Sequence, residues 1–221
     1  MPIVDLSLTV NNAMAGVDIS VAKQLKTDGW NATTLKLYSH SGTHMDALCH
    51  FLDGARTIDQ QPLDVLVGPA EVINLAPAWP RQLFSIADLL PFETRITPGS
   101  RLLLRTDWHT RYGTDEYRNQ LPRISRELAQ WFVEKKVALL GVEPPSVADV
   151  NDLSEVTEVH QILFRGGIVI VEGLVNLNLL GNGQVEFTAL PLKIEGGDGS
   201  PVRAIAKTDR AIAKTDSHVA S

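Results

Sequence analysis

Residues 39–51 read SHSGTHMDALCHF, and this stretch holds three of the six histidines in the chain together with one aspartate. The four side chains His40, His44, Asp46 and His50 follow one another at spacings of four, two and four residues. Imidazole and carboxylate together form a ligand set that suits a borderline divalent ion such as zinc or manganese. Any one of these histidines alone would be an ordinary surface or core residue, but the cluster predicts a metal site.

The backbone around this cluster is predicted to be a strand that runs into a turn. A helix would place His40 and His44 on one face, but Gly42 and Thr43 between them are poor helix formers. Residues 30–38, which precede the cluster, are rich in threonine and alternating leucine, as is typical of a strand. Because glycine tolerates conformations closed to other residues, a bend at Gly42 would let the side chains surround an ion at the end of that strand.

Composition places the chain among ordinary globular proteins. Of its 221 residues 44% are hydrophobic and 21% are charged, and one domain over residues 1–207 is the expectation. The formal net charge of −6 argues against a nucleic-acid partner, which would call for clustered lysine and arginine. No apolar stretch approaches about 18 residues and no signal peptide precedes the first strand, so we expect a cytoplasmic protein with no membrane partner.

Short apolar segments alternate with amphipathic ones along the rest of the chain. Strands are predicted at residues 3–10, 30–38, 68–75, 101–105, 137–142, 168–174, 185–192 and 200–206. Helices are predicted at 85–90, 125–136 and 154–164, with Ser85 and Ser125 as N-caps. A helix followed at once by a strand at 137–142 implies an α/β arrangement. Residues 11–28 show only weak periodicity, and a loop there could cover a site.

Two further side chains of ligand type lie more than a hundred positions after the first cluster. Glu172 interrupts the apolar strand predicted at 168–174, where an unpaired ionised carboxylate would cost several kcal/mol. Glu172 therefore needs a cation or a proton. His160 lies on the helix predicted at 154–164, where a lone histidine would ordinarily have a backbone or solvent partner.

The ordered set of these residues resembles the metal-dependent cyclase family, which includes bacterial kynurenine formamidases and isatin hydrolases. The motif is His40-x-x-x-His44-x-Asp46 with His50 four residues on, followed by His160 and Glu172 at a spacing of twelve. The resemblance covers nearly the whole chain, with further matches at residues 4–7, 141–146, 189–193 and 200–204.

The resemblance implies a role for each residue of the site. His40, His44 and Asp46 would hold one ion, and Asp46, His160 and Glu172 would hold a second, so that Asp46 bridges the two. His50 would be an acid/base beside them. Zinc is the expected metal, with manganese as the alternative and one or two ions per chain. The implied fold is α/β, a layered domain of mixed sheet with a barrel-like part, of the swivelling β/β/α type, assembled as a homodimer or homotetramer.

The chemistry of such a site agrees with this resemblance. A bound dication can lower the pKa of water to about 7, supplying hydroxide to attack an amide carbonyl that the ion also polarises. His50 can then give a proton to the departing amine. We expect a hydrolase of a non-peptide carbon–nitrogen bond in a small-molecule amide, most like an arylformamidase that releases formate and an arylamine.

Two alternatives to this function remain open. The first is opening of a cyclic amide, as isatin hydrolases do, because residues 11–28 lack the Trp-Pro-Gly type of motif typical of formamidases. The second is a non-catalytic metal-binding module, in which the ions are structural and His50 is only their neighbour.

Several other residues receive simpler interpretations. Cys49 cannot form an internal disulfide and is expected to be a small, buried and inert apolar residue. Trp79 and Trp108 are expected in the core or an interface, with an aromatic substrate pocket as the alternative, and His109 is expected at the surface. The segment 203–209 is repeated at 210–216, and residues 208–221 are expected to form a disordered tail.

Overall fold

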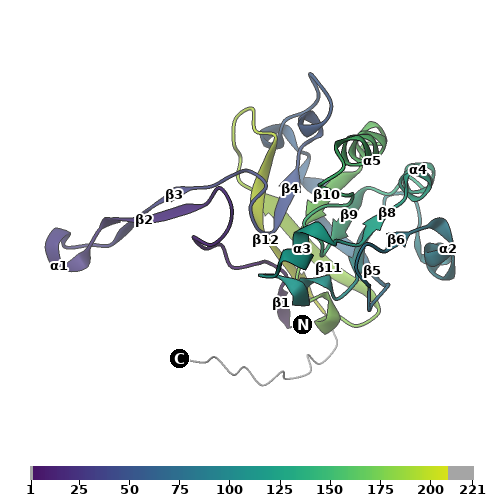
Figure 1. The fold of residues 1–221 in the computed structure, drawn as a ribbon, viewed down its shortest axis with the longest axis horizontal. Coiled ribbons are helices and arrows are strands. Elements are labelled where there is room, and N and C mark those ends of the chain that lie inside the picture. Colours follow the sequence, from purple (N-terminus) through teal and green to yellow (C-terminus); the bar gives the residue numbers. More distant parts are fainter. Residues whose placement is uncertain (1, 209–221) are drawn as a thin grey trace.

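The computed structural model describes residues 2–208, and a large sheet forms its centre (Figure 1). Four smaller strands lie outside this sheet and form two separate two-stranded sheets, β2 with β3 and β6 with β8. The strands of the main sheet are β1 (Ile3–Asp5), β4 (His44–Asp46), β5 (Val67–Asn74), β7 (Arg101–Arg105), β9 (Leu139–Val142), β10 (Val169–Glu172), β11 (Gly183–Pro191) and β12 (Gly199–Lys207). The smaller strands are β2 (Asp18–Lys23), β3 (Ala32–Lys36), β6 (Leu83–Phe84) and β8 (Arg123–Ile124).

The main sheet closes on itself. Its strand order is β1-β12-β11-β5-β7-β9-β10-β4, and β4 pairs with β12 as well as with β10. β1 is thus an extra strand on a closed ring formed by the others. Strands β5, β7, β9 and β10 run parallel to one another, whereas the remaining pairs are antiparallel. The prediction of a mixed α/β sheet with a barrel-like part is confirmed.

Helices pack on the outside of this barrel (Figure 1). The helix predicted at 125–136 is α4, and its cap is confirmed because the Ser125 side chain accepts a hydrogen bond from the Leu128 backbone. The helix predicted at 154–164 is α5, capped by Asp152. The α-helices are α1 (Leu25–Asp28), α2 (Ile86–Leu89), α3 (Asp115–Asn119), α4 (Arg126–Glu134) and α5 (Leu153–Arg165). The 3-10 helices are η1 (Leu48–His50), η2 (Ile58–Gln60), η3 (Leu63–Val65), η4 (Leu90–Arg95), η5 (Trp108–Arg111) and η6 (Leu177–Leu179).

Two hydrophobic cores lie on opposite faces of the barrel wall. Met45 and Val171 point into the barrel and pack in its interior core. Ile170 packs instead in the outer core, with Phe132 of α4 and Phe164 of α5. Because successive side chains of a strand alternate between faces, the neighbours of Met45 and Val171 must point outward, towards the helices. His44, Asp46 and Glu172 are those neighbours.

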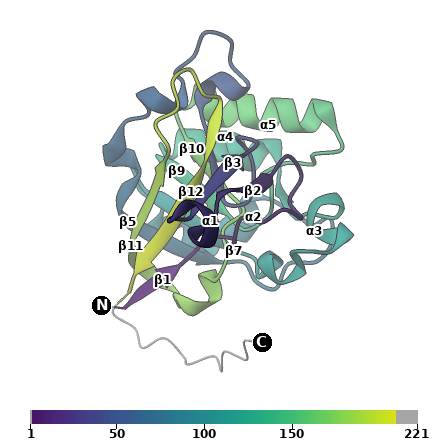
Figure 2. The same cartoon turned by 90° about the vertical axis from the view of Figure 1, so that its left-hand side faces the viewer.

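The N-terminal region differs most from the prediction. The strand predicted at 3–10 ends at Asp5, and beyond it only Ser7 forms an isolated bridge, to Leu174. Residues 11–28 contain β2 and α1, which the sequence did not reveal. A period-two pattern arises where one face of a strand is buried. β2 and β3 instead form a hairpin that stands clear of the barrel in Figure 1 and points towards the viewer in Figure 2.

No helix within residues 2–208 combines the length and the hydropathy that crossing a membrane requires. Residues 209–221, which include the second copy of the C-terminal repeat and most of the expected tail, lie outside the described residues. Thr208 is still described, and its backbone N–H donates a hydrogen bond to the carbonyl of Pro2 at 3.2 Å.

Candidate metal centre

Strands β4 and β10 and helix α5 bring the two groups of ligand-type residues together. In the antiparallel pairing of β4 with β10, His44 stands opposite Glu172. His44 Nε2 lies 3.3 Å from Glu172 Oε2 and 3.6 Å from Asp46 Oδ1. His160 Nε2 lies 3.5 Å from Glu172 Oε1 and 3.6 Å from Asp46 Oδ2. Two imidazoles and two carboxylates, all of them buried, therefore lie side by side, and each histidine faces a different oxygen of each carboxylate.

Two glycines permit the close approach of the segments that carry these residues. Gly42 and Gly173 both have positive φ, 63° and 68°. A Cβ on Gly173 would lie 2.6 Å from the carbonyl oxygen of Gly42, so only glycine fits there. Thr43 joins the same segments, because its hydroxyl donates to the carbonyl of Gly173 at 2.6 Å and accepts from the backbone of Leu8 at 2.8 Å.

Backbone carbonyls fix the orientation of two imidazoles. His44 Nδ1 lies 3.0 Å from the carbonyl oxygen of Gly42, and His160 Nδ1 lies 2.6 Å from that of Val156. A carbonyl can only accept, so each Nδ1 carries a proton, and in the neutral ring Nε2 is a lone-pair acceptor. Both lone pairs face the carboxylates of Asp46 and Glu172. Acceptors directed at one another require a proton or a cation between them.

The spacing of these atoms fits a divalent ion. Ligands held about 2.1 Å from a tetrahedral zinc ion are separated from each other by roughly 3.4 Å. The four separations given above, 3.3 to 3.6 Å, agree with this value. Asp46 Oδ2 is also buried without a hydrogen-bond partner among the described residues, which is costly unless a cation binds it. The donor set and its geometry thus suit a metal.

His40 and His50 form a second group beside the first, again around Asp46. His40 Nδ1 lies 2.8 Å from Asp46 Oδ1, and its Nε2 lies 3.1 Å from Asp198 Oδ2. The ring of His50 stacks on that of His40 with centroids 4.0 Å apart. Ligand atoms of His40, Asp46 and His50 lie within 4.8 Å of one another, as do those of His44, Asp46 and Glu172. His44 lies beside both His40, with ring centroids 5.2 Å apart, and Glu172, so its assignment to the ion of His40 stays a prediction.

Asp198 is a member of the site that the sequence analysis missed. It lies in the loop before β12, and its Oδ2 is 3.5 Å from His50 Nδ1 as well as 3.1 Å from His40 Nε2. Its signal in the sequence is weak, an acid between glycines in the segment 196–199, directly before the matched residues 200–204.

The electrostatics of the cluster without an ion show what a metal would replace. Burial by itself lowers the pKa of His44 and of His160, but the carboxylates of Glu172 and Asp46 outweigh burial and raise both pKa values. Burial likewise disfavours the charged form of Glu172, yet these two histidines hold its pKa well below the usual range. For His40, Asp46 and Asp198 outweigh burial and raise the pKa to about 9. A dication bound between these rings and carboxylates would take the place of the protons that the carboxylates favour.

A cavity opens from the cluster and continues into a larger one. The first, of about 130 Å³, is lined by the site residues together with Phe51, Ser146 and Val156. The second, of about 500 Å³, shares five wall residues with the first: Tyr38, His40, His44, Pro145 and Val150. Its other walls include Leu8, Met14, Tyr112, Tyr117 and Arg118. The site can therefore receive a small molecule with an apolar body.

Two of the simpler interpretations can now be judged. Trp108 is buried and donates from Nε1 to the carbonyl of Tyr117, whereas Trp79 is 63% exposed. Neither lines the two cavities, so the alternative that they form an aromatic substrate pocket is wrong. Phe51 and three tyrosines, not tryptophans, supply the aromatic walls.

His109 was expected at the surface, and this expectation is wrong. Its Nδ1 lies 2.9 Å from Oε1 of Glu143, a fully buried carboxylate. Oε2 of Glu143 accepts from the backbone and hydroxyl of Thr106 and from the backbone of Trp108. Asp107 nearby is held by Arg105 through two hydrogen bonds. Although these acids and His109 are ligand types, their oxygens already have donors, and the cluster is a structural network.

Comparison with known proteins adds a family to this geometry. A family model described as putative cyclase matches residues 4–149. The kynurenine formamidase of Bacillus cytotoxicus is 34% identical over 213 residues, covering 92% of this chain and 96% of that protein. That of Bacillus thuringiensis subsp. konkukian is 32% identical over 212 residues, with the same coverage. Isatin hydrolase A from Ralstonia solanacearum superposes with a TM-score of 0.84 at 25% identity, covering 94% of this chain and 92% of that one.

Proposed function

The chain belongs to the putative cyclase family, and on that premise we propose that it is a metal-dependent arylformamidase, which releases formate and an arylamine. Kynurenine formamidases and isatin hydrolases are both hydrolases of carbon–nitrogen bonds outside peptides, so this chain is a hydrolase of that class. One observation carries the metal dependence: the Nε2 atoms of His44 and His160 converge on the carboxylates of Asp46 and Glu172.

The residues that would hold the metal are His44, Asp46, His160 and Glu172, with His40 beside Asp46. Imidazole and carboxylate ligands suit zinc, with manganese as the alternative, and the sharing of Asp46 by two groups allows one or two ions. When bound, such a dication lowers the pKa of water to about 7 and polarises the carbonyl oxygen of the substrate.

His50 supplies the proton transfers in this proposal. An imidazole can accept the proton of the attacking water and give it to the departing arylamine near neutral pH. Three neighbours hold the ring of His50 in place. The ring of His40 stacks on it, the ring centroid of Phe51 lies 4.4 Å from its own, and Asp198 Oδ2 lies 3.5 Å from its Nδ1. Asp198 is a positioning residue, because it touches His50 and His40.

The larger cavity supports an aryl substrate that carries an anionic group. Its volume of about 500 Å³ and its walls of Tyr38, Tyr112 and Tyr117 suit an aromatic ring. Arg118 is the only lysine or arginine among the described residues that line it. Its guanidinium hydrogen-bonds the neutral side chains of Asn119 and Asn151, which leaves its charge for a substrate carboxylate. A substrate of the N-formylkynurenine type has both features.

Opening of a cyclic amide is the second candidate function. It is favoured by the TM-score of 0.84 with isatin hydrolase A, because that likeness covers the whole barrel and not only the ligand cluster. The metal cluster and His50 would act in the same way on either substrate. The larger cavity and Arg118 favour the open-chain substrate with a carboxylate.

Steady-state kinetics with N-formylkynurenine, formanilide and isatin test the proposal. The metal-loaded protein should give the highest kcat/KM with N-formylkynurenine, at least tenfold above formanilide, which lacks the carboxylate. Arg118→Gln should raise the KM for N-formylkynurenine several-fold and leave formanilide unchanged. The highest kcat/KM with isatin would favour the cyclic-amide function. No hydrolysis of any of the three by the metal-loaded protein would refute the proposal.

A further inference from the structure

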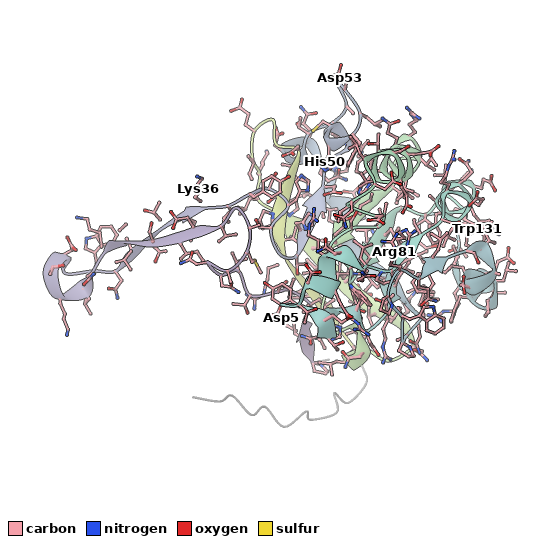
Figure 3. All side chains as sticks on the ribbon, in the orientation of Figure 1. Asp5, Lys36, His50, Asp53, Arg81 and Trp131 are labelled. Atoms are coloured by element: carbon pink, nitrogen blue, oxygen red, sulfur yellow. The ribbon has the colours of Figure 1, made fainter. Side chains whose placement is uncertain are left out.

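Ser146 contributes a buried hydroxyl to the smaller cavity, whose other walls are formed by the metal-site residues and His50. The residue is 4% exposed and lines this cavity of about 130 Å³. His50 lies beside β4 and α5 (Figure 3), with its ring centroid 6.4 Å from that of His160. In the proposed reaction His50 moves protons and the cluster holds the metal, whereas Ser146 has no part.

The hydroxyl of Ser146 has a proton that it can donate. The backbone N–H of Ala148 donates a hydrogen bond to its Oγ at 3.3 Å. A serine hydroxyl combines one donor with two acceptor sites, so this bond leaves the donor unused. Within residues 2–208 no acceptor receives the proton of Ser146. A ligand in the smaller cavity can therefore supply that acceptor.

The backbone on both sides of Ser146 is fixed against the strand that carries Glu172. The carbonyl of Pro144 accepts a hydrogen bond from the backbone of Gly173 at 2.9 Å. The backbone N–H of Val147 donates to Glu172 Oε1 at 2.8 Å. Ser146 lies between these two contacts, so its place beside the metal cluster is set before a substrate enters. A donor fixed in advance needs no reorganisation when charge develops on a substrate.

The other donors of this cavity are committed or exposed. His40 directs its Nδ1 to Asp46 and its Nε2 to Asp198, at 2.8 and 3.1 Å. The second hydroxyl belongs to Tyr38, which is 56% exposed and is shared with the larger cavity. Among the described residues that line the smaller cavity, Ser146 is thus the buried hydroxyl that is left for a substrate.

We propose that Ser146 is a catalytic residue, whose hydroxyl donates a hydrogen bond to the carbonyl oxygen of the substrate amide; this inference rests on the proposed function. As the oxygen of water bonds to the carbonyl carbon, the electron pair of the C=O bond moves onto the carbonyl oxygen. Ser146 stabilises the charge there and keeps its own proton. The pair returns as the C–N bond breaks, and the arylamine nitrogen takes its proton from His50.

Steady-state kinetics of Ser146→Ala with N-formylkynurenine test the proposal. Because removal of one such donor costs at least about a hundredfold in kcat, we expect a fall of that size. KM should change less than about threefold, since the uncharged carbonyl of the bound substrate gains less from the bond. The matched control is Ser125→Ala, because the Ser125 hydroxyl also accepts from a backbone N–H, that of Leu128, but lines neither cavity. The control should keep kcat within about twofold.

A merely structural role for Ser146 predicts a different result. Its bond to Ala148 shapes the turn from which Val147 donates to Glu172. If Ser146→Ala acted through this turn, metal affinity would fall about tenfold or more together with kcat. Competition with a chelator on the same preparations should instead show unchanged metal affinity. A fall in metal affinity that accounts for the lost turnover would overturn the proposal, and so would a kcat equal to that of the parent.

Titration calorimetry on the metal-loaded parent and Ser146→Ala gives a measurement that needs no turnover. Phenylphosphonate presents tetrahedral, negatively charged oxygens and should bind the variant about tenfold more weakly, whereas acetanilide, a planar neutral amide, should bind both equally. Equal affinity of the two proteins for phenylphosphonate, or no binding of it to the parent, would contradict the proposal. A parent that hydrolyses no amide refutes the proposed function separately, because the phosphonate still tests the contact of Ser146 with an oxyanion.

Discussion

His50 is the residue on which the catalytic account depends most. It lies in η1, one residue after Cys49, and its side chain is 25% exposed at the wall of the smaller cavity. A ring in this place can reach both solvent and a bound substrate. It also lies within 4.8 Å of ligand atoms of His40 and Asp46, so its role as a proton carrier must be separated from a role as a ligand.

Replacing His50 by alanine distinguishes these roles. We predict that His50→Ala keeps its metal and its fold while kcat falls about a hundredfold or more, the usual scale for a general acid/base. The measurement is metal content and kcat on the same preparation. Cys49→Ala is the control, because its thiol donates to the carbonyl of Gly197, at 3.6 Å, and packs against the interior core, and it should keep kcat within about twofold. Loss of metal together with activity in His50→Ala would make His50 a ligand.

The sequence predicted some of these residues and not others for physical reasons. Glu172 could be found because an acid in an apolar strand needs a partner wherever the strand lies. His160 could be linked to it only through the family resemblance, because a lone histidine on a helix has many possible partners. Asp198 lies in an exposed loop, where an acid needs no partner, and only the folded structure places it beside His50.

At the level of elements, the turn after β10 controls how closely the two halves of the site approach. Gly173 directly follows Glu172, and its Cα lies against the turn at Gly42 and Thr43 that directly precedes β4. The register of His44 with Glu172 depends on this contact. An added Cβ must therefore displace either the Glu172 strand or the His44 strand.

Gly173→Ala should destabilise the protein and weaken the metal site. We predict a loss of roughly 3 kcal/mol in the free energy of unfolding, of which about 1 kcal/mol comes from positive φ and the rest from the clash. Gly167→Ala is the matched control, since Gly167 has φ 75° but nothing within 4 Å of an added Cβ. In urea denaturation the control should lose about 1 kcal/mol of the free energy of unfolding, and it should keep its full metal content. Equal losses in both variants would contradict the steric account.

Elements with a buried face could be predicted from the sequence, whereas of the two exposed hairpin strands only β3 could, through its threonines and alternating leucines. The strand at β7 shows a continuous apolar run because both of its faces are buried, Leu102 and Leu104 in the outer core and Leu103 in the interior core. The helix at α4 shows a helical pattern because the outer core covers one side of it. The hairpin strand β2 was missed because neither of its faces is buried within the described residues. The short strands β6 and β8 contain two residues each, too few for any period to be visible.

For the molecule as a whole, closure of the barrel creates the site. Strand β4 completes the ring between β10 and β12, so the ligand-bearing strand closes the barrel and also borders α5. Sequence alone implied the barrel only through the family resemblance, because strand order and the pairing of β4 with two partners depend on contacts between residues far apart in the chain. Metal binding should therefore stabilise the closed barrel as well as supply the chemistry.

Turnover measured as a function of bound metal tests the central claim most directly. The protein is stripped with a chelator, reloaded with increasing zinc or manganese, and assayed for hydrolysis of its best substrate and for metal per chain on the same samples. The cluster around Asp46 predicts that activity falls to near zero in the stripped protein and rises with metal until one or two ions are bound per chain. A metal-free protein that keeps the turnover of the loaded one would contradict the account.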